Sequence, residues 1–137
     1  MTTSDIRIYI VSILFLLLAE AIWNFFMLAG TLYVLKQRAV LYTKNFYVYI
    51  IYGTIASTII DRGFQFTVFS FSYLNNIWTD TGFLIHLGFM IAPIVLLTIF
   101  HYYLINRLFD FDAKTTFKIA IVLGVLTAPW PTFFSNF

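Results

Sequence analysis

A long apolar segment of this chain contains two adjacent residues of opposite charge, Asp61 and Arg62. The segment runs from Tyr47 to Ser72 and holds no other charged residue. A segment of this kind is typical of a membrane span, where one ionised side chain costs about 2.5–3.5 kcal/mol on insertion scales. Other protein groups must therefore satisfy the pair, and the way they do so is the best guide to the role of the chain.

The composition indicates that the solvent of this chain is lipid. It is 61% hydrophobic, 21% aromatic and 10% charged, whereas soluble domains carry roughly 25% charged residues. At 137 residues it is predicted to form a single domain, 1–137, with no soluble domain attached. The absence of cysteine excludes disulfides and thiol chemistry in this chain, and a net charge of +2 does not favour a nucleic-acid partner.

Four segments are long and apolar enough to be predicted as spans, because a helix needs about 20 such residues to cross the hydrocarbon core. They cover about 8–35, 46–73, 82–105 and 115–133. The first is too long for the apolar region of a cleavable signal and is interpreted as a retained helix. The predicted fold class is an all-α integral membrane protein, an antiparallel bundle of four transmembrane helices.

Basic residues predict the orientation of the bundle. Six of the eight lysines and arginines lie in or directly beside the first and third connections, from Lys36 to Lys44 and from Asn106 to Lys118, and one, Arg7, precedes the first span. By the positive-inside rule these connections face the cytoplasm. Both termini then lie outside the plasma membrane. Tyr49 and His101 are expected near the cytoplasmic interface, His101 because it adjoins Tyr102 and Tyr103.

Polar residues recur at helical spacing on the first two predicted spans and are expected to form a buried network. Its predicted members are Glu20, Asn24, Ser57, Thr58, Asp61, Arg62 and Gln65. Arg62 is expected to pair with Glu20, with Asp61 or with both. Since neighbouring helix residues point about 100° apart, Asp61 and Arg62 are not expected to satisfy only each other, and one of them is a candidate to face another subunit.

Two interpretations of this network are open. It could hold the helices together, as polar groups do in membrane bundles, or it could carry a proton or ion, since intramembrane acids mark such paths. No continuous charged relay runs along the four segments. This favours the structural interpretation.

The histidines do not predict a metal site. His86 and His101 are 15 residues apart, roughly 22 Å along one helix, so they cannot share an ion. His86 with Asp80 in the preceding loop is the remaining candidate pair, but catalytic zinc sites usually take three protein ligands. An interfacial or hydrogen-bonded histidine is the preferred interpretation. No catalytic residues are predicted, because phosphate-loop, HExxH and GxSxG motifs are absent.

As a whole the chain resembles the small hydrophobic accessory subunit of archaeal ammonia monooxygenase, a copper membrane monooxygenase. The resemblance covers the opening MTTSDIRIYIVSILFLLLAE, four spans, richness in Phe and Tyr, and the lack of Cys. It implies that the chain binds no cofactor itself, that copper lies in partner subunits of an oxidoreductase complex, and that this chain packs beside them.

These observations predict a non-catalytic structural subunit whose partners are other membrane subunits and lipids. The alternative is a small proton-coupled transporter. In support of the alternative, Glu20 is similar to the single glutamate in the first helix of small multidrug transporters, which also have four spans. The Asp61–Arg62 pair and the length of the first two segments depart from that family.

Overall fold

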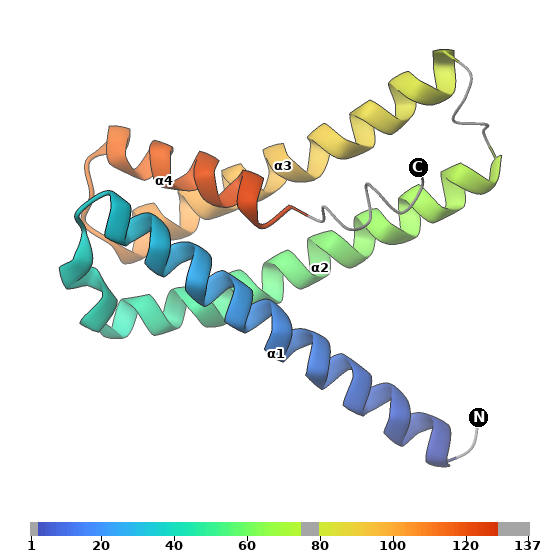
Figure 1. The fold of residues 1–137 in the computed structure, drawn as a ribbon, viewed down its shortest axis with the longest axis horizontal. Helices are drawn as coiled ribbons and strands as arrows, with labels where there is room; N and C mark the ends of the chain where they lie inside the picture. Colours follow the sequence, from blue (N-terminus) through green and yellow to red (C-terminus); the bar gives the residue numbers. More distant parts are fainter. Residues whose placement is uncertain (1–2, 75–79, 129–137) are drawn as a thin grey trace.

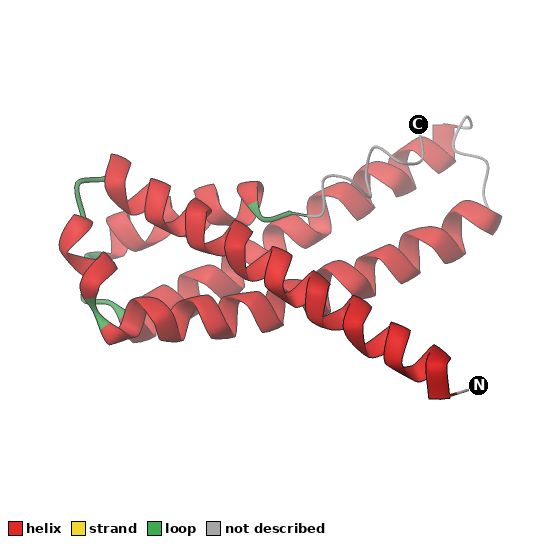
Figure 2. Cartoon of the chain, turned by 60° about the horizontal axis from the view of Figure 1, so that its bottom comes forward, coloured by secondary structure: helices red, strands yellow, loops and turns green. Residues whose placement is uncertain are grey.

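The computed structural model describes residues 3–74 and 80–128 (Figure 1). It contains helices α1 (Thr3–Val34), α2 (Lys44–Leu74), α3 (Asp80–Leu108) and α4 (Ala113–Leu126), with a short 3₁₀ helix, η1 (Arg38–Tyr42), between the first two. Every regular element in these two ranges is helical (Figure 2). The structure therefore confirms the all-α class.

The helices agree with the four predicted segments except at the end of the last one. The first three helices match within five residues at each end. The fourth ends at Leu126, where the Thr127 N–H bonds to the carbonyl of Leu123 at 2.8 Å. Ala128 precedes Pro129, and a residue before proline is disfavoured in the α conformation. The rest of the predicted fourth span, 129–133, lies outside the described residues.

Two helices are long and apolar enough to cross a membrane, over Ser4–Val34 and Phe83–Leu108. In the most apolar 18-residue stretch of each helix, only 6% and 17% of the residues, respectively, are buried within the chain. The core helix of a soluble protein is mostly buried instead. Low burial combined with high hydropathy fits a helix surrounded by lipid or by other membrane helices.

The core lies at the end of the molecule where η1 and the α3–α4 connection are found (Figure 1). It combines the C-terminal half of α1, the N-terminal half of α2, the C-terminal half of α3, and α4. The buried apolar members are Leu28, Leu32, Phe46, Tyr49, Ile105, Phe109, Ile119 and Leu123. All four helices are thus held together at one end.

The N-terminal half of α1 leaves the bundle. In both views it passes α2 and points away from the other helices (Figures 1 and 2). Residues 4–16 are all exposed. The point where α1 diverges from α2 is important because the predicted charged residues lie beside it.

Local hydrogen bonds define where two of the helices end and begin. After α1, Lys36 adopts φ 60°, and the N–H of Gln37 bonds to the carbonyl of Leu32 at 2.8 Å, the pattern of a Schellman cap. At the start of α4, the Asp112 carboxylate accepts from the N–H of Thr115 at 3.1 Å and from its hydroxyl. Hydrogen bonds from Thr115 lower the pKa of Asp112 below its ordinary value.

Helix α4 approaches α3 closely at Gly124. A Cβ at this position would lie 2.9 Å from the backbone nitrogen of Thr98 and 3.0 Å from its Cα, on α3. Real Cβ atoms do not come that close to a backbone that cannot move aside. Gly124 therefore lets α4 pack directly against α3.

We predict that Gly124→Ala destabilises the fold by about 1–3 kcal/mol, the usual cost of overpacking. Gly88→Ala on α3 is the matched control, because nothing lies within 4 Å of its added Cβ. In detergent, circular dichroism should show a lower unfolding temperature for Gly124→Ala and an unchanged or higher one for Gly88→Ala. Equal unfolding temperatures for the two variants would contradict the close contact.

Candidate functional site: two polar clusters

The first polar cluster lies where α1 crosses α2, and we call it the crossing cluster: Glu20 and Asn24 on α1 with Ser57, Thr58, Asp61, Arg62 and Gln65 on α2. Its centre is a buried hydrogen bond from Asn24 Nδ2 to Ser57 Oγ at 3.1 Å. The Ser57 hydroxyl in turn donates to the carbonyl of Gly53 at 2.6 Å. The two side chains are almost fully buried, so this bond ties α1 to α2.

The charged members of the crossing cluster lie near one another without direct contact. Both Glu20 and Asp61 interact electrostatically with Arg62, and Asp61 also interacts with Glu20. Asp61 is buried and Glu20 half-buried. Among the residues that the structure describes, no salt bridge joins Arg62 to either carboxylate. The structure thus brings the three residues together but leaves the expected ion pair unformed.

Arg62 instead points to the outside of the chain. Its side chain is exposed, and Nη1 donates to Oε1 of Gln65 at 2.9 Å, one turn further along α2. A guanidinium offers five N–H donors. The guanidinium is therefore held on the outer face of α2 by a neighbour on the same helix.

The inner face of α2 carries buried oxygen atoms that lack a hydrogen-bond partner within the described residues. They are Thr54 Oγ1, Thr58 Oγ1 and Asp61 Oδ1. Thr58 was expected to extend the network by a hydrogen bond and makes none there. These three residues follow one another at helical spacing, so they form a polar stripe that faces into the bundle.

The second polar cluster joins three segments through one buried histidine, and we call it the His101 chain. The hydroxyl of Tyr49 on α2 lies 2.5 Å from His101 Nδ1 on α3. His101 Nε2 lies 3.1 Å from the hydroxyl of Thr127, which follows α4. The exposed fractions of Tyr49, His101 and Thr127 are 1%, 0% and 3%, so water does not compete for these bonds.

The hydrogen-bond directions in the His101 chain are fixed by its last member. Thr127 donates its hydroxyl proton to the carbonyl of Leu123 at 2.7 Å, so its oxygen must accept from His101 Nε2. A neutral imidazole has one donor and one acceptor nitrogen. In neutral His101, Nδ1 is therefore the acceptor and the Tyr49 hydroxyl donates a hydrogen bond to it, which satisfies every group in the chain.

Sequence reasoning placed Tyr49 and His101 near the cytoplasmic interface but did not predict that the two side chains bond to each other in the core of the chain. The signal for Tyr49 was present, since Tyr49, Gly53, Ser57 and Asp61 follow one another at intervals of four. Extending the polar stripe toward the N-terminus of α2 would have included it. Thr127 lies 26 residues from His101, and no local pattern connects them.

Two further side chains cap helix ends in other parts of the fold. Trp23 Nε1 on α1 donates to the carbonyl of Leu126 at 3.1 Å, and Asn45 Nδ2 on α2 donates to the carbonyl of Leu108 at 2.7 Å. The last carbonyls of a helix have no partner within it. These bonds satisfy the ends of α4 and α3 from a neighbouring helix.

The candidate metal pair lies only partly in the described residues. His86 is buried on α3, while the side chain of Asp80 lies outside the described residues. Within the described part of the chain, no group of three His, Cys, Asp or Glu side chains is placed to hold a metal ion.

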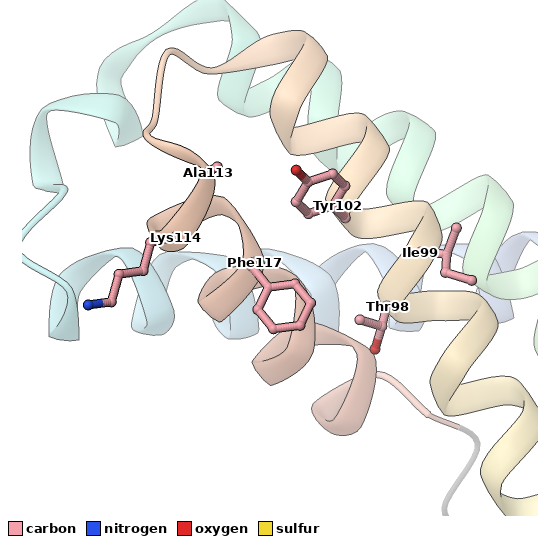
Figure 3. Close-up of a pocket in the computed structure, with 6 residues that line it drawn as sticks. All are labelled: Thr98, Ile99, Tyr102, Ala113, Lys114 and Phe117. Atoms are coloured by element: carbon pink, nitrogen blue, oxygen red, sulfur yellow. The ribbon is translucent and has the colours of Figure 1, made fainter.

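An open groove of about 510 Å³ lies between α3 and the first turns of α4 (Figure 3). Its walls are mainly apolar, and Tyr102 meets Phe117 edge to face with ring centroids 6.5 Å apart. The lining residues are Thr98, Ile99, Tyr102, Ala113, Lys114 and Phe117. In Figure 3 the Lys114 ammonium extends away from Tyr102 and Phe117, so the groove itself is a hydrophobic surface.

No protein-family model, curated protein or solved structure matches this chain.

We predict that Tyr49→Phe destabilises the protein by about 1–3 kcal/mol, because the buried His101 Nδ1 loses its donor. Tyr47→Phe removes a hydroxyl from an exposed ring and serves as the control. Thermal unfolding in detergent, followed by circular dichroism, should show a lower midpoint for Tyr49→Phe alone. The His101 chain would lose its assigned role if both variants matched the wild type.

Proposed function

We propose that this chain is a membrane-embedded, non-catalytic accessory subunit that packs against other membrane subunits of a larger complex. In this proposal α2 and α4 lie in the membrane together with α1 and α3. The chain resides in the plasma membrane with both termini outside. The resemblance stated above suggests a copper membrane monooxygenase complex of the ammonia monooxygenase type, in which the partner subunits hold copper.

The observation that carries the proposal is the outward-facing Arg62. In a span, an arginine near mid-membrane costs several kcal/mol if it meets lipid. Arg62 lies 18 residues into the 31-residue α2, is exposed, and has one hydrogen-bond partner in the described chain, Gln65. A chain that functioned alone in lipid would leave this charge uncovered. A partner that packs over it removes that cost.

The divergence of α1 supports the same proposal. Its N-terminal half presents large apolar side chains that are exposed, including Ile8, Val11 and Phe15. Apolar exposure by itself fits lipid as well as protein. Beside Arg62 and the half-buried Glu20, however, a further membrane helix fits better than acyl chains, since a protein can offer partners for both charges.

The buried polar groups support a structural role. The His101 ring uses both nitrogens to connect helices, and Asn24 is bonded across the α1–α2 crossing. In membrane bundles such polar contacts hold helices together, typically by about 0.6 kcal/mol each. Because these side chains already use their hydrogen bonds to join helices, we assign them a structural role in assembly.

A proton-coupled transporter is the second candidate, and the buried Asp61 favours it. Asp61 Oδ1 is buried without a hydrogen-bond partner in the described residues, and such an oxygen could exchange a proton. A transporter of this size would function as a monomer or homodimer. The composition of the purified particle therefore separates the two candidates.

We predict that the tagged chain, extracted from its native membrane in mild detergent, carries other membrane proteins in fixed stoichiometry. Native mass spectrometry measures the mass and subunit composition of the particle directly. The control is the same preparation from an untagged strain. Recovery of the chain as a lone monomer or homodimer would contradict the accessory role.

We also predict opposite labelling at the two ends of α1. The chain has no cysteine, so Ser4→Cys and Tyr42→Cys each introduce a single thiol, near the N-terminus and in the exposed η1. A membrane-impermeant maleimide added to intact cells should label Ser4→Cys, and should label Tyr42→Cys only after permeabilisation. Labelling of both from outside would contradict the proposed topology.

A further inference from the structure

Helix α2 has two different stripes of side chains along its length. The inner stripe contains Thr54, Thr58, Asp61 and Gln65, at intervals of four, three and four residues. The outer stripe is displaced by one residue and contains Tyr52, Ile55, Ile59, Arg62 and Phe66, at intervals of three, four, three and four. We call the second set the outer seam.

Every member of the outer seam is exposed. Tyr52, Ile55, Ile59 and Phe66 are 58%, 49%, 66% and 75% exposed, and Arg62 is exposed as well. Alternating intervals of three and four residues are the pattern with which one helix packs along another. The seam extends over 15 residues, from Tyr52 to Phe66, and the helix rises roughly 21 Å between them, which is long enough for three turns or more of a second helix.

Resting on the proposed accessory function, we infer that the outer seam docks a transmembrane helix of a partner subunit and that Arg62 pairs with a carboxylate on that helix. The partner helix would present an apolar face with one Asp or Glu at the depth of Arg62. The apolar members of the seam provide the packing surface, and the single charge fixes the register of the two helices, as one polar residue does in a coiled-coil seam.

The sign of the partner charge follows from the groups that already surround Arg62. On its own helix, Gln65 accepts one of the five guanidinium N–H groups. Asp61 faces the inner stripe and is buried, and Glu20 on α1 is half-buried. Neither forms a salt bridge with Arg62 in the described residues. The group left on the outer surface is thus a cation, and a bidentate carboxylate is its best acceptor.

A lipid-facing surface would not explain the seam. Side chains that face acyl chains are apolar, and an arginine near mid-membrane is expected to face protein or water. At protein interfaces, arginine surrounded by apolar side chains is a common energetic centre, because the apolar groups exclude water from its ion pair. Arg62, between Ile59 and Phe66, has these surroundings.

The test measures binding of synthetic helices to the full chain in phosphatidylcholine nanodiscs. The chain carries a donor dye at Tyr42→Cys, and the probe is a 24-residue Leu/Ala transmembrane peptide (about 36 Å long) with an acceptor dye. Three versions of the peptide carry Glu, Lys or Leu at the central position. The efficiency of energy transfer is measured as the density of peptide in the nanodisc increases, and this gives the relative affinities. The three peptides are first compared on the labelled chain with Arg62 intact.

We expect the Glu peptide to bind about tenfold more tightly than the Leu peptide, which corresponds to about 1.4 kcal/mol. The Lys peptide should gain nothing. Arg62→Gln should abolish the preference for Glu, whereas Arg7→Gln, which removes the same charge on α1, should preserve it. Equal affinity for all peptides, preference for Lys, or a Glu preference that survives Arg62→Gln would each overturn the inference.

Three further outcomes distinguish failure of this inference from failure of the proposed function. If the native complex forms with the Arg62→Gln chain in unchanged yield, the accessory role stands and the docking role of Arg62 fails. If the chain self-associates and Arg62→Gln abolishes that association, a second copy occupies the seam and the inference fails. Absence of any partner in the native particle would instead remove the proposed function, whatever the peptides show.

Discussion

Neighbouring residues on an α-helix point about 100° apart, and this constraint organises the structure around α2. It places Asp61 inside the bundle and Arg62 outside it, although the two are adjacent in sequence. The inner face of α2 then meets α1 through the Asn24–Ser57 bond and α3 through the Tyr49–His101 bond. The outer face carries the exposed side chains of Ile59 and Arg62. The helix thus connects the fold of this chain to the proposed complex.

The bundle is held at one end by neutral hydrogen bonds rather than by ion pairs. Tyr49, His101 and Thr127 form a chain in which each proton has a defined acceptor. A neutral chain avoids the desolvation penalty of buried ions. Three contacts hold α4, which has only 14 residues, against its neighbours. Gly124 lets α4 pack closely on α3, and hydrogen bonds from His101 to Thr127 and from Trp23 to Leu126 bind its C-terminal end.

The sequence supported the prediction of the helices better than that of their contacts. Apolar length predicted the bounds of α1, α2 and α3 within a few residues, and helical spacing placed Asn24 and Ser57 in one network without predicting that they bond to each other. The His101 chain was missed because its members come from three segments and share no local pattern. The hydrogen-bond partner of Arg62 could not be predicted either. Helical spacing gives the direction in which a side chain leaves its helix, but it does not select between Glu20, Asp61 and Gln65 as the partner.

The central claim is that protein, not lipid, covers the outer seam of α2. Spin labels at Ile55→Cys and Ile59→Cys, with Thr54→Cys as the inward control, report this through collision with oxygen dissolved in the hydrocarbon. In bilayers that contain the isolated chain, both seam positions should be accessible to oxygen and the control should not. In the native complex, the account predicts that the two seam positions lose this accessibility. Equal oxygen accessibility at Ile55 and Ile59 in the isolated chain and in the complex would contradict it.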